Sequence, residues 1–124
     1  MIILYAEDDQ EDLDTFYDII NLIDPDIKCI HAKDGAEALE ILDNAIVLPD
    51  YIFLDINMPH MDGKACLINI KSDSRFKSIP VIIYTTSNRK SDVEMFMKLG
   101  AAKYMIKPNT FREAVESLGR FFRS

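Results

Sequence analysis

The stretch YIFLDINMPHMDG, residues 51–63, contains the pattern that decides the fold. Its first four residues are apolar and run directly into Asp55, and a loop marked by Pro59 and Gly63 follows. A continuously apolar run of this length is typical of a strand with helices over both faces of a parallel sheet. Because the buried strand ends on a carboxylate, we expect that carboxylate to serve a site at the end of the strand.

Four further apolar runs predict the other strands: IILYA (2–6), IKCIHA (27–32), VIIYT (81–85) and KYMIK (103–107). The segments between the runs have the apolar spacing of helices. Alternating strands and helices argue for an α/β fold, a doubly wound (βα)5 domain with a five-stranded parallel sheet. We expect one domain over residues 1–124, because this length supports a single core and no linker composition interrupts it.

Side-chain patterns predict the helices in more detail. The first two helices carry apolar stripes, formed by Leu13, Phe16, Tyr17, Ile20 and Ile23, and by Ala38, Leu39, Ile41 and Leu42. Capping-box spacing indicates three helix starts, at Asp34 with Glu37, Ser91 with Glu94, and Thr110 with Glu113. Gly100 has the position of a helix C-cap, and the last helix is expected at about residues 111–122.

The composition argues against several classes of function. With 14 basic and 21 acidic residues the net charge is −7, which disfavours non-specific binding to nucleic acid or to an anionic membrane. Cys29 and Cys66 are too few for a disulfide framework and lack the spacing of a zinc pair. Since no apolar run approaches the roughly 20 residues of a membrane span, we expect a cytoplasmic protein with reduced thiols.

Polar side chains follow the ends of four predicted strands, namely Glu7, Asp8, Asp55, Thr85 and Lys107. The carboxyl ends of parallel strands share one edge of a sheet, so we expect these residues to lie close together. Grouped carboxylates repel one another and must take up protons, bind a cation or pair with a base. Their oxygen atoms suit Mg²⁺, and a lysine and a hydroxyl beside that ion form a cradle for a tetrahedral anion. An aspartate in this cradle can act as the nucleophile that accepts a phosphoryl group.

The sequence resembles the receiver domain of two-component response regulators over essentially its whole length. Four segments carry the resemblance in order: ILYAEDD (3–9), LDINMPHMDG (54–63), IPVIIYTTS (79–87) and LGAAKYMIKP (99–108). The resemblance implies the flavodoxin-like receiver fold and is closest to regulators that are a lone receiver without an output domain. It implies a phosphoacceptor in a phosphorelay and not an enzyme, with only self-catalysed phosphotransfer and autodephosphorylation.

The resemblance also assigns roles to the strand-end residues. Asp55 is the implied phosphoacceptor. Mg²⁺ is expected at Asp8, Asp55 and the backbone carbonyl of Asn57, with Glu7 acting at the same ion. Asp9 then opens the first helix, although the run EDD leaves open a register in which Asp8 and Asp9 form the acidic pair.

Further positions correspond to residues that, in this family, change conformation on phosphorylation or set the lifetime of the phosphoryl group. In the family pattern, Thr85 bonds to the new phosphoryl group, Lys107 pairs with its oxygens, and Tyr104 turns inward when the threonine hydroxyl moves. The remaining assignments are the switch residues Thr85 and Tyr104, the hydrolysis-tuning positions Asn57 and Ser87, and a cis peptide bond between Lys107 and Pro108.

The implied phosphoryl source is a phosphohistidine on a sensor histidine kinase or a histidine phosphotransfer protein. The downstream protein target is expected on the face built from the fourth helix, the fifth strand and the fifth helix, which includes Tyr104. Phe121 and Phe122 either contribute to that face or close the core. We expect no nucleic-acid partner and no membrane insertion, and the resemblance allows a homodimer.

Two alternative functions stay open. A receiver-like interaction module that phosphorylation does not regulate would share the fold. A phosphohydrolase of the aspartyl-phosphate class also uses a strand-end aspartate and Mg²⁺, but it usually carries a second aspartate two positions later, where this chain has Asn57. A flavodoxin is disfavoured because no Ser/Thr/Gly-rich phosphate loop follows the first strand, and the P-loop motif is likewise missing from the sequence.

Overall fold

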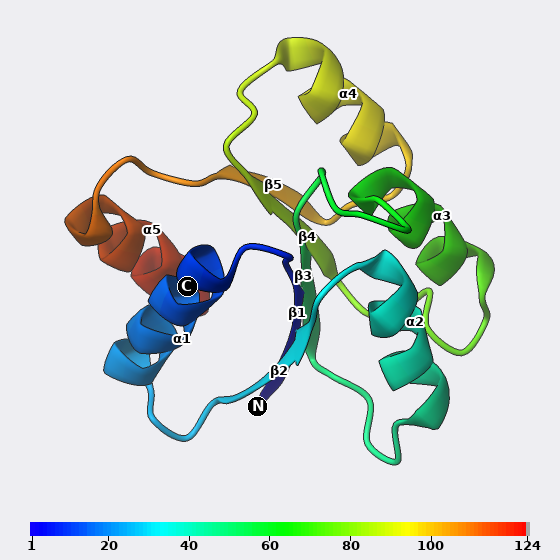
Figure 1. Ribbon diagram of the computed structural model, residues 1–124, viewed down its shortest axis with the longest axis horizontal. Helices are drawn as coiled ribbons and strands as arrows, with labels where there is room; N and C mark the ends of the chain where they lie inside the picture. The colour runs from blue at the N-terminus through cyan, green and yellow to red at the C-terminus, as the bar shows by residue number, and fades with distance from the viewer. Residues whose placement is uncertain (124) are drawn as a thin grey trace.

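Five strands and five helices alternate along the computed structural model, which describes residues 1–123 (Figure 1). The strands are β1 (Ile2–Ala6), β2 (Lys28–Ala32), β3 (Tyr51–Leu54), β4 (Val81–Thr85) and β5 (Lys103–Ile106). The helices are α1 (Gln10–Ile23), α2 (Gly35–Asn44), α3 (Gly63–Ser72), α4 (Lys90–Lys98) and α5 (Phe111–Arg123). The predicted α/β fold is confirmed. In the described part of the chain, none of the helices is long and apolar enough to cross a membrane.

The five strands form one parallel sheet in the order β2-β1-β3-β4-β5. Helices α1 and α5 cover one face of the sheet, and α2, α3 and α4 cover the other (Figure 1). β1 pairs with β2 on one side and with β3 on the other, so the strand order reverses at β1. Open parallel sheets bind ligands at the carboxyl ends of the strands beside such a reversal. The candidate site is therefore expected where β1 and β3 end.

Alternate strand residues face two hydrophobic cores, one on each side of the sheet. Leu4 and Leu54 belong to the core under α2, α3 and α4, whereas Tyr5 and Phe53 belong to the core under α1 and α5. Phe16 of α1 fills the second core, with its ring centroid 4.3 Å from that of Tyr5 and 5.2 Å from that of Phe53. A slip of one residue would move each set of side chains into the wrong core, so burial on both faces fixes the strand register.

Two of the three predicted helix starts are confirmed. The Asp34 carboxylate accepts a hydrogen bond from the backbone N–H of Glu37 at 2.8 Å, and the Thr110 hydroxyl accepts one from the N–H of Glu113 at 3.1 Å. Gly100 follows α4 with a φ of 106°, which agrees with its predicted role at the end of that helix.

The third capping pair, Ser91 with Glu94, is wrong. Helix α4 begins one residue before Ser91, and its N-cap Arg89 makes no side-chain capping bond. Another contact holds the loop to the start of the helix: the Ser87 hydroxyl donates a hydrogen bond to Asp92 at 2.6 Å. A contact from outside the helix therefore replaces the local cap that the sequence pattern predicts.

The predicted apolar stripe of α1 is wrong at one position. Tyr17 is 55% exposed, whereas Ile19, which the prediction leaves out, is 1% exposed. Helix α1 packs against both the sheet and α5, so its buried surface is centred on Phe16, Ile19 and Ile20. The docking direction of the helix selects which of two neighbouring apolar residues is buried.

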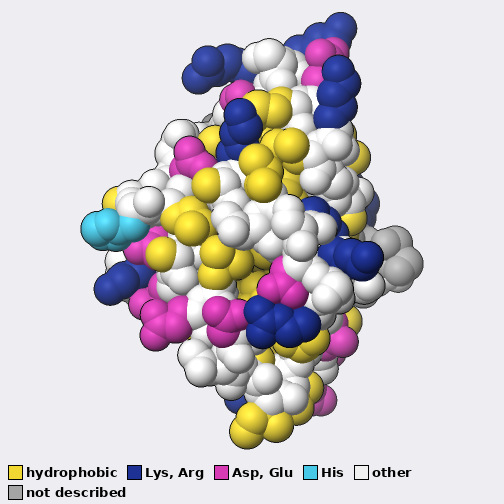
Figure 2. Space-filling view, turned by 90° about the vertical axis from the view of Figure 1, so that its right-hand side faces the viewer, with side chains coloured by type: hydrophobic (Ala, Val, Ile, Leu, Met, Phe, Trp, Pro, Cys, Tyr) yellow, Lys and Arg dark blue, Asp and Glu magenta, His cyan; other side chains and the backbone are white. Residues whose placement is uncertain are grey.

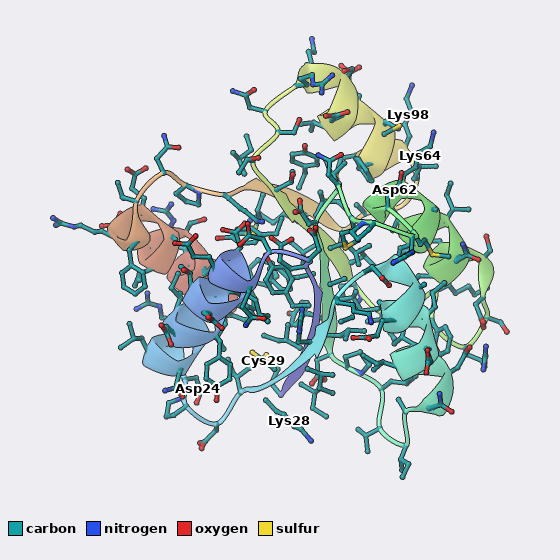
Figure 3. All side chains as sticks on the ribbon, in the orientation of Figure 1. Asp24, Lys28, Cys29, Asp62, Lys64 and Lys98 are labelled. Carbon is teal, nitrogen blue, oxygen red and sulfur yellow. The ribbon has the colours of Figure 1, made fainter. Side chains whose placement is uncertain are left out.

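Replacing Gly63 by alanine is expected to destabilise the fold and to disturb the backbone of Asp55. Gly63 follows Asp62, which is labelled at the start of α3 in Figure 3, and a Cβ on Gly63 would collide with the backbone oxygen of Asp55. We expect Gly63→Ala to lower the free energy of unfolding by roughly 1–3 kcal/mol, measured by urea denaturation. The exposed neighbouring substitution Lys64→Ala is the control, and equal unfolding midpoints for the two variants would contradict the close approach.

Candidate functional site

The sheet register brings the ends of four strands together. Because Ala6 pairs with Leu54, the next residues, Glu7 and Asp55, lie side by side, and the Asp55 N–H donates to the backbone oxygen of Ala6 at 3.2 Å. On the other side, Lys107 follows β5 and its N–H donates to the backbone oxygen of Thr85, the last residue of β4, at 2.6 Å. The predicted convergence of these residues at one edge is therefore present.

Three carboxylates form a group that can hold a metal ion. Oxygen atoms of Glu7, Asp8 and Asp55 lie within 4.8 Å of one another. Glu7 is fully buried, and its Oε2 atom lacks a hydrogen-bond partner among residues 1–123. A buried carboxylate oxygen without a partner is costly, and a hard cation with oxygen ligands would satisfy it. The residues present therefore fit a divalent cation.

The contacts of Asp8 and Asp9 distinguish between the two acidic pairs that the sequence leaves open. Asp8 is grouped with Glu7 and Asp55, whereas Asp9 caps α1 by accepting hydrogen bonds from the backbone N–H groups of Glu11 and Asp12. Asn57 is exposed in the loop after β3. The geometry thus favours the register in which Glu7 and Asp8 form the pair.

Lys107 lies among three carboxylates at the same edge. Its Nζ atom is 2.9 Å from Oε1 of Glu7, 3.0 Å from Oδ2 of Asp12 and 3.6 Å from Oδ2 of Asp55. Asp12 is the residue that sequence reasoning missed, because it lies in the first turn of α1 and not at a strand end. The sequence offered one indication of this position. Helix α1 begins directly after the acidic run, so its first turn, which includes Asp12, lies at the edge where the strands end.

Burial and mutual charge shift the titration of this group. Burial and the neighbouring Asp55 carboxylate raise the pKa of the Glu7 carboxyl to about 9, although Lys107 opposes both effects. Burial alone would lower the pKa of Lys107, but the Asp55, Glu7 and Asp12 carboxylates raise it to about 12. Burial raises the pKa of Asp12, but hydrogen bonds with Lys107 and Glu7 and the charge of Lys107 together outweigh it, so the pKa of Asp12 is lowered. Near neutral pH the metal-free site therefore holds a cationic lysine and a proton on Glu7.

The predicted switch residues lie in β4 and β5, and both contact Ser87 in the loop between β4 and α4. Thr85 is 2% exposed, and its hydroxyl accepts a long hydrogen bond of 3.5 Å from the N–H of Ser87. The half-buried Tyr104 donates its hydroxyl to the backbone oxygen of Ser87 at 2.9 Å, and its ring centroid lies 6.2 Å from that of Phe96. Tyr104 therefore ties β5 to the loop that follows Thr85.

The predicted cis peptide bond is wrong. No peptide bond within residues 1–123 is cis, so the bond between Lys107 and Pro108 is trans. A trans bond before proline is favoured by about 0.5–1 kcal/mol. The contacts of the Lys107 backbone with Thr85 and of its side chain with Glu7 form without the rarer isomer.

The chain is similar in sequence and structure to known signalling proteins. The sequence model described as the response regulator receiver domain matches residues 3–118. Chemotaxis protein CheY1 of Helicobacter pylori is 39% identical over 89 residues, which are 72% of this chain and 71% of that protein.

Two solved structures share the fold over nearly the whole chain. The phosphorylated cyanobacterial phytochrome response regulator RcpA superposes with a TM-score of 0.90 at 26% identity, covering 97% of this chain and 89% of that one. The Mn²⁺-bound form of response regulator Rcp1 superposes with a TM-score of 0.87 at 27% identity, covering 97% and 90% of the two chains. A similar protein thus binds a divalent cation.

Protonation of Glu7 predicts an unusual dependence of stability on pH in metal-free buffer. The pKa of Glu7 rises from 4.5 to about 9 on folding, so the folded chain retains a proton that the unfolded chain releases. The stability of the wild type relative to Glu7→Gln should therefore be greatest below about pH 4.5 and fall, by roughly several kcal/mol, as the pH rises toward 9. Urea unfolding with a chelator present, across that range, measures this difference.

The exposed residue Glu40 provides the matched control for the loss of a carboxylate, and Glu40→Gln is measured across the same pH range. A constant difference for Glu7→Gln would contradict a raised pKa in the folded chain.

Proposed function

The chain belongs to the response regulator receiver domain family, and from this premise we propose that Asp55 accepts a phosphoryl group from a phosphohistidine partner and thereby switches a protein-binding face. The phosphoacceptor role is general to the family. The observation that carries the proposal here is the convergence of Asp55 with two further carboxylates and Lys107 at the carboxyl edge of the sheet.

The transfer that we propose is a displacement at phosphorus. A carboxylate oxygen of Asp55 forms the new P–O bond while the P–N bond to the histidine of the partner breaks, and the imidazole nitrogen keeps the electron pair of that bond. Phosphoryl transfer asks a protein mainly for positioning and charge neutralisation. Lys107 is near enough to pair with phosphoryl oxygens, since its Nζ is 3.6 Å from Asp55. The Thr85 hydroxyl is the proposed hydrogen-bond donor to the same group.

We propose Mg²⁺ as the metal ion of this site. Glu7, Asp8 and Asp55 would hold it together with the backbone carbonyl of Asn57. When bound, the ion supplies positive charge that neutralises the phosphoryl oxygens. The unpartnered Oε2 atom of Glu7 and the Mn²⁺-bound form of a similar regulator support a divalent cation here. The site offers carboxylate oxygens but too few protein ligands to surround an ion completely. This suits Mg²⁺, which usually keeps several bound waters.

The proposed output is a change on the face formed by α4, β5 and α5. Movement of Thr85 toward the phosphoryl group would disturb the loop to which Tyr104 donates its hydrogen bond. Each element of the face carries an exposed apolar side chain, since Met97 is 43%, Ile106 46% and Phe111 50% exposed. Figure 2 shows Lys and Arg side chains gathered over α4 at the top of that view. A protein target, or a second copy of the chain, would bind this face more tightly in one state.

On the same premise, we propose that a sensor histidine kinase or a histidine phosphotransfer protein is the partner of the chain and that the chain acts in the cytoplasm. Self-catalysed phosphotransfer and autodephosphorylation are the only chemistry proposed, with Asn57 and Ser87 as the residues that tune hydrolysis. In the absence of phosphorylation, the Ser87 hydroxyl is engaged with Asp92 at 2.6 Å, so this bond would have to break before Ser87 could contact the phosphoryl group.

Intact-mass measurement tests the phosphoacceptor role directly. On incubation with a small-molecule phosphodonor and Mg²⁺, the wild type should gain the mass of one phosphoryl group, and removal of Mg²⁺ by a chelator should abolish the gain. Asp55→Asn should show no gain, whereas Asp18→Asn, which removes an exposed carboxylate on α1, should behave like the wild type. A phosphoryl group on Asp55→Asn would refute the assignment. No gain by the wild type, together with confirmed Mg²⁺ binding, would favour either a strict dependence on a partner kinase or the interaction module that phosphorylation does not regulate.

A further inference from the structure

The ammonium group of Lys107 has more carboxylate neighbours than the proposed phosphoryl transfer requires. A lysine carries three N–H donors. Two of them are used at short range, by Glu7 at 2.9 Å and by Asp12 at 3.0 Å. Asp55 lies 3.6 Å away, beyond a good charge-assisted hydrogen bond. The phosphoacceptor is thus the most weakly paired of the three carboxylates around Lys107.

Asp12 reaches Lys107 from a different element than the other two carboxylates do. Its side chain is 47% exposed, whereas those of Glu7 and Lys107 are 0% and 9% exposed. Its backbone is fixed in the first turn of α1, because its N–H donates to the capping carboxylate of Asp9 at 3.1 Å. Asp12 and Lys107 line an open cavity of about 290 Å³ between α1 and the start of α5. Removing the Asp12 carboxylate would therefore admit water and leave the hydrophobic core intact.

We propose that Asp12 is a positioning residue that holds the Lys107 ammonium group away from Asp55 and so keeps the Asp55 carboxylate open to a divalent cation. The inference rests on the proposed function, since it takes Asp55 as a metal ligand and phosphoacceptor. It adds a residue of α1 to the machinery at the strand ends.

Competition for one cation is the physical basis of this role. Lys107 is nearly buried and gains from every carboxylate that it can reach. If Asp12 is removed, its attraction for the ammonium group is lost, and that group can close on Asp55 to a charge-assisted distance of about 2.8 Å. A direct ion pair on Asp55 would then have to be broken, or shared, when a metal ion binds. Loss of Asp12 should therefore weaken metal binding through Lys107, in addition to any long-range loss of negative charge.

The test compares Mg²⁺ affinities by isothermal titration calorimetry. Asp12→Ala should weaken Mg²⁺ binding roughly fivefold or more. Glu11→Ala is the matched control, because Glu11 is an exposed acidic residue in the same helical turn, and it should weaken binding about twofold or less. Equal losses for the two variants would overturn the proposal, since charge alone would then explain the effect.

A double-mutant cycle asks whether Asp12 acts through Lys107. In a Lys107→Gln background no ammonium group remains to close on Asp55, so adding Asp12→Ala should change the Mg²⁺ affinity by about twofold or less. A loss in that background as large as the loss in the wild type would overturn the proposal. An intact cooperative unfolding transition for each variant shows that the comparison is made between folded proteins.

A metal-free crystal structure of Asp12→Ala supplies the second readout. The distance from Lys107 Nζ to Asp55 Oδ2, 3.6 Å with Asp12 present, should fall to about 2.8 Å. An unchanged distance would overturn the proposal. If Asp55→Asn binds Mg²⁺ as tightly as the wild type does, the metal site of the proposed function fails, and this metal-free distance still decides the role of Asp12.

Discussion

The hydrogen bond from Lys107 to Glu7 is the interaction on which the arrangement of the site depends. Both groups are largely removed from water, with side-chain exposures of 9% and 0%, so each would be costly to bury alone. The two residues follow strands that are not neighbours, since β3 and β4 lie between β1 and β5. To reach Glu7, the Lys107 side chain must extend along the carboxyl edge of the sheet past the end of β3. Its place beside Asp55 is a consequence of this reach.

The sheet supplies the rigidity that this arrangement needs. Burial of the central strands on both faces fixes their register, and the register sets Glu7 against Asp55 without further adjustment. The loop after Asp55 folds back on itself, because the N–H of Gly63 at its far end donates to the backbone oxygen of Ile56 at 2.9 Å. Asp55 is thereby held between a fixed strand and a tight loop, and its side chain remains 15% exposed.

The charge balance of the site makes it responsive. The site contains one ammonium group and four carboxylates, those of Glu7, Asp8, Asp12 and Asp55, and the excess negative charge favours either a proton on Glu7 or a bound cation. Any group that adds negative charge at Asp55 will compete for the same lysine. A site with this balance rearranges when its charge changes, and the hydrogen bond from Tyr104 to Ser87 connects the end of β4 to the surface on β5.

The sequence by itself determined the order of strands and helices and the residues at the strand ends, because apolar periodicity and turn chemistry are local properties. It also predicted Asp55, Thr85 and Lys107 as neighbours, since parallel strands place their carboxyl ends on one edge. Only the tertiary structure decided that Asp12 shares Lys107. That contact joins α1 to the end of β5 over 95 residues of sequence, and no local pattern encodes the distance between them.

The same distinction explains the predictions that were wrong. Tyr17 and Ile19 are both apolar and close in sequence, and only the docking of α1 against the sheet and α5 buries Ile19. Ser91 has the spacing of a cap, but α4 begins at Lys90, and the Ser87 hydroxyl bonds to Asp92 in the first turn of that helix. The sequence specifies which residues can form each element. The packing of those elements decides which side chains meet, because that choice depends on contacts between segments far apart in the chain.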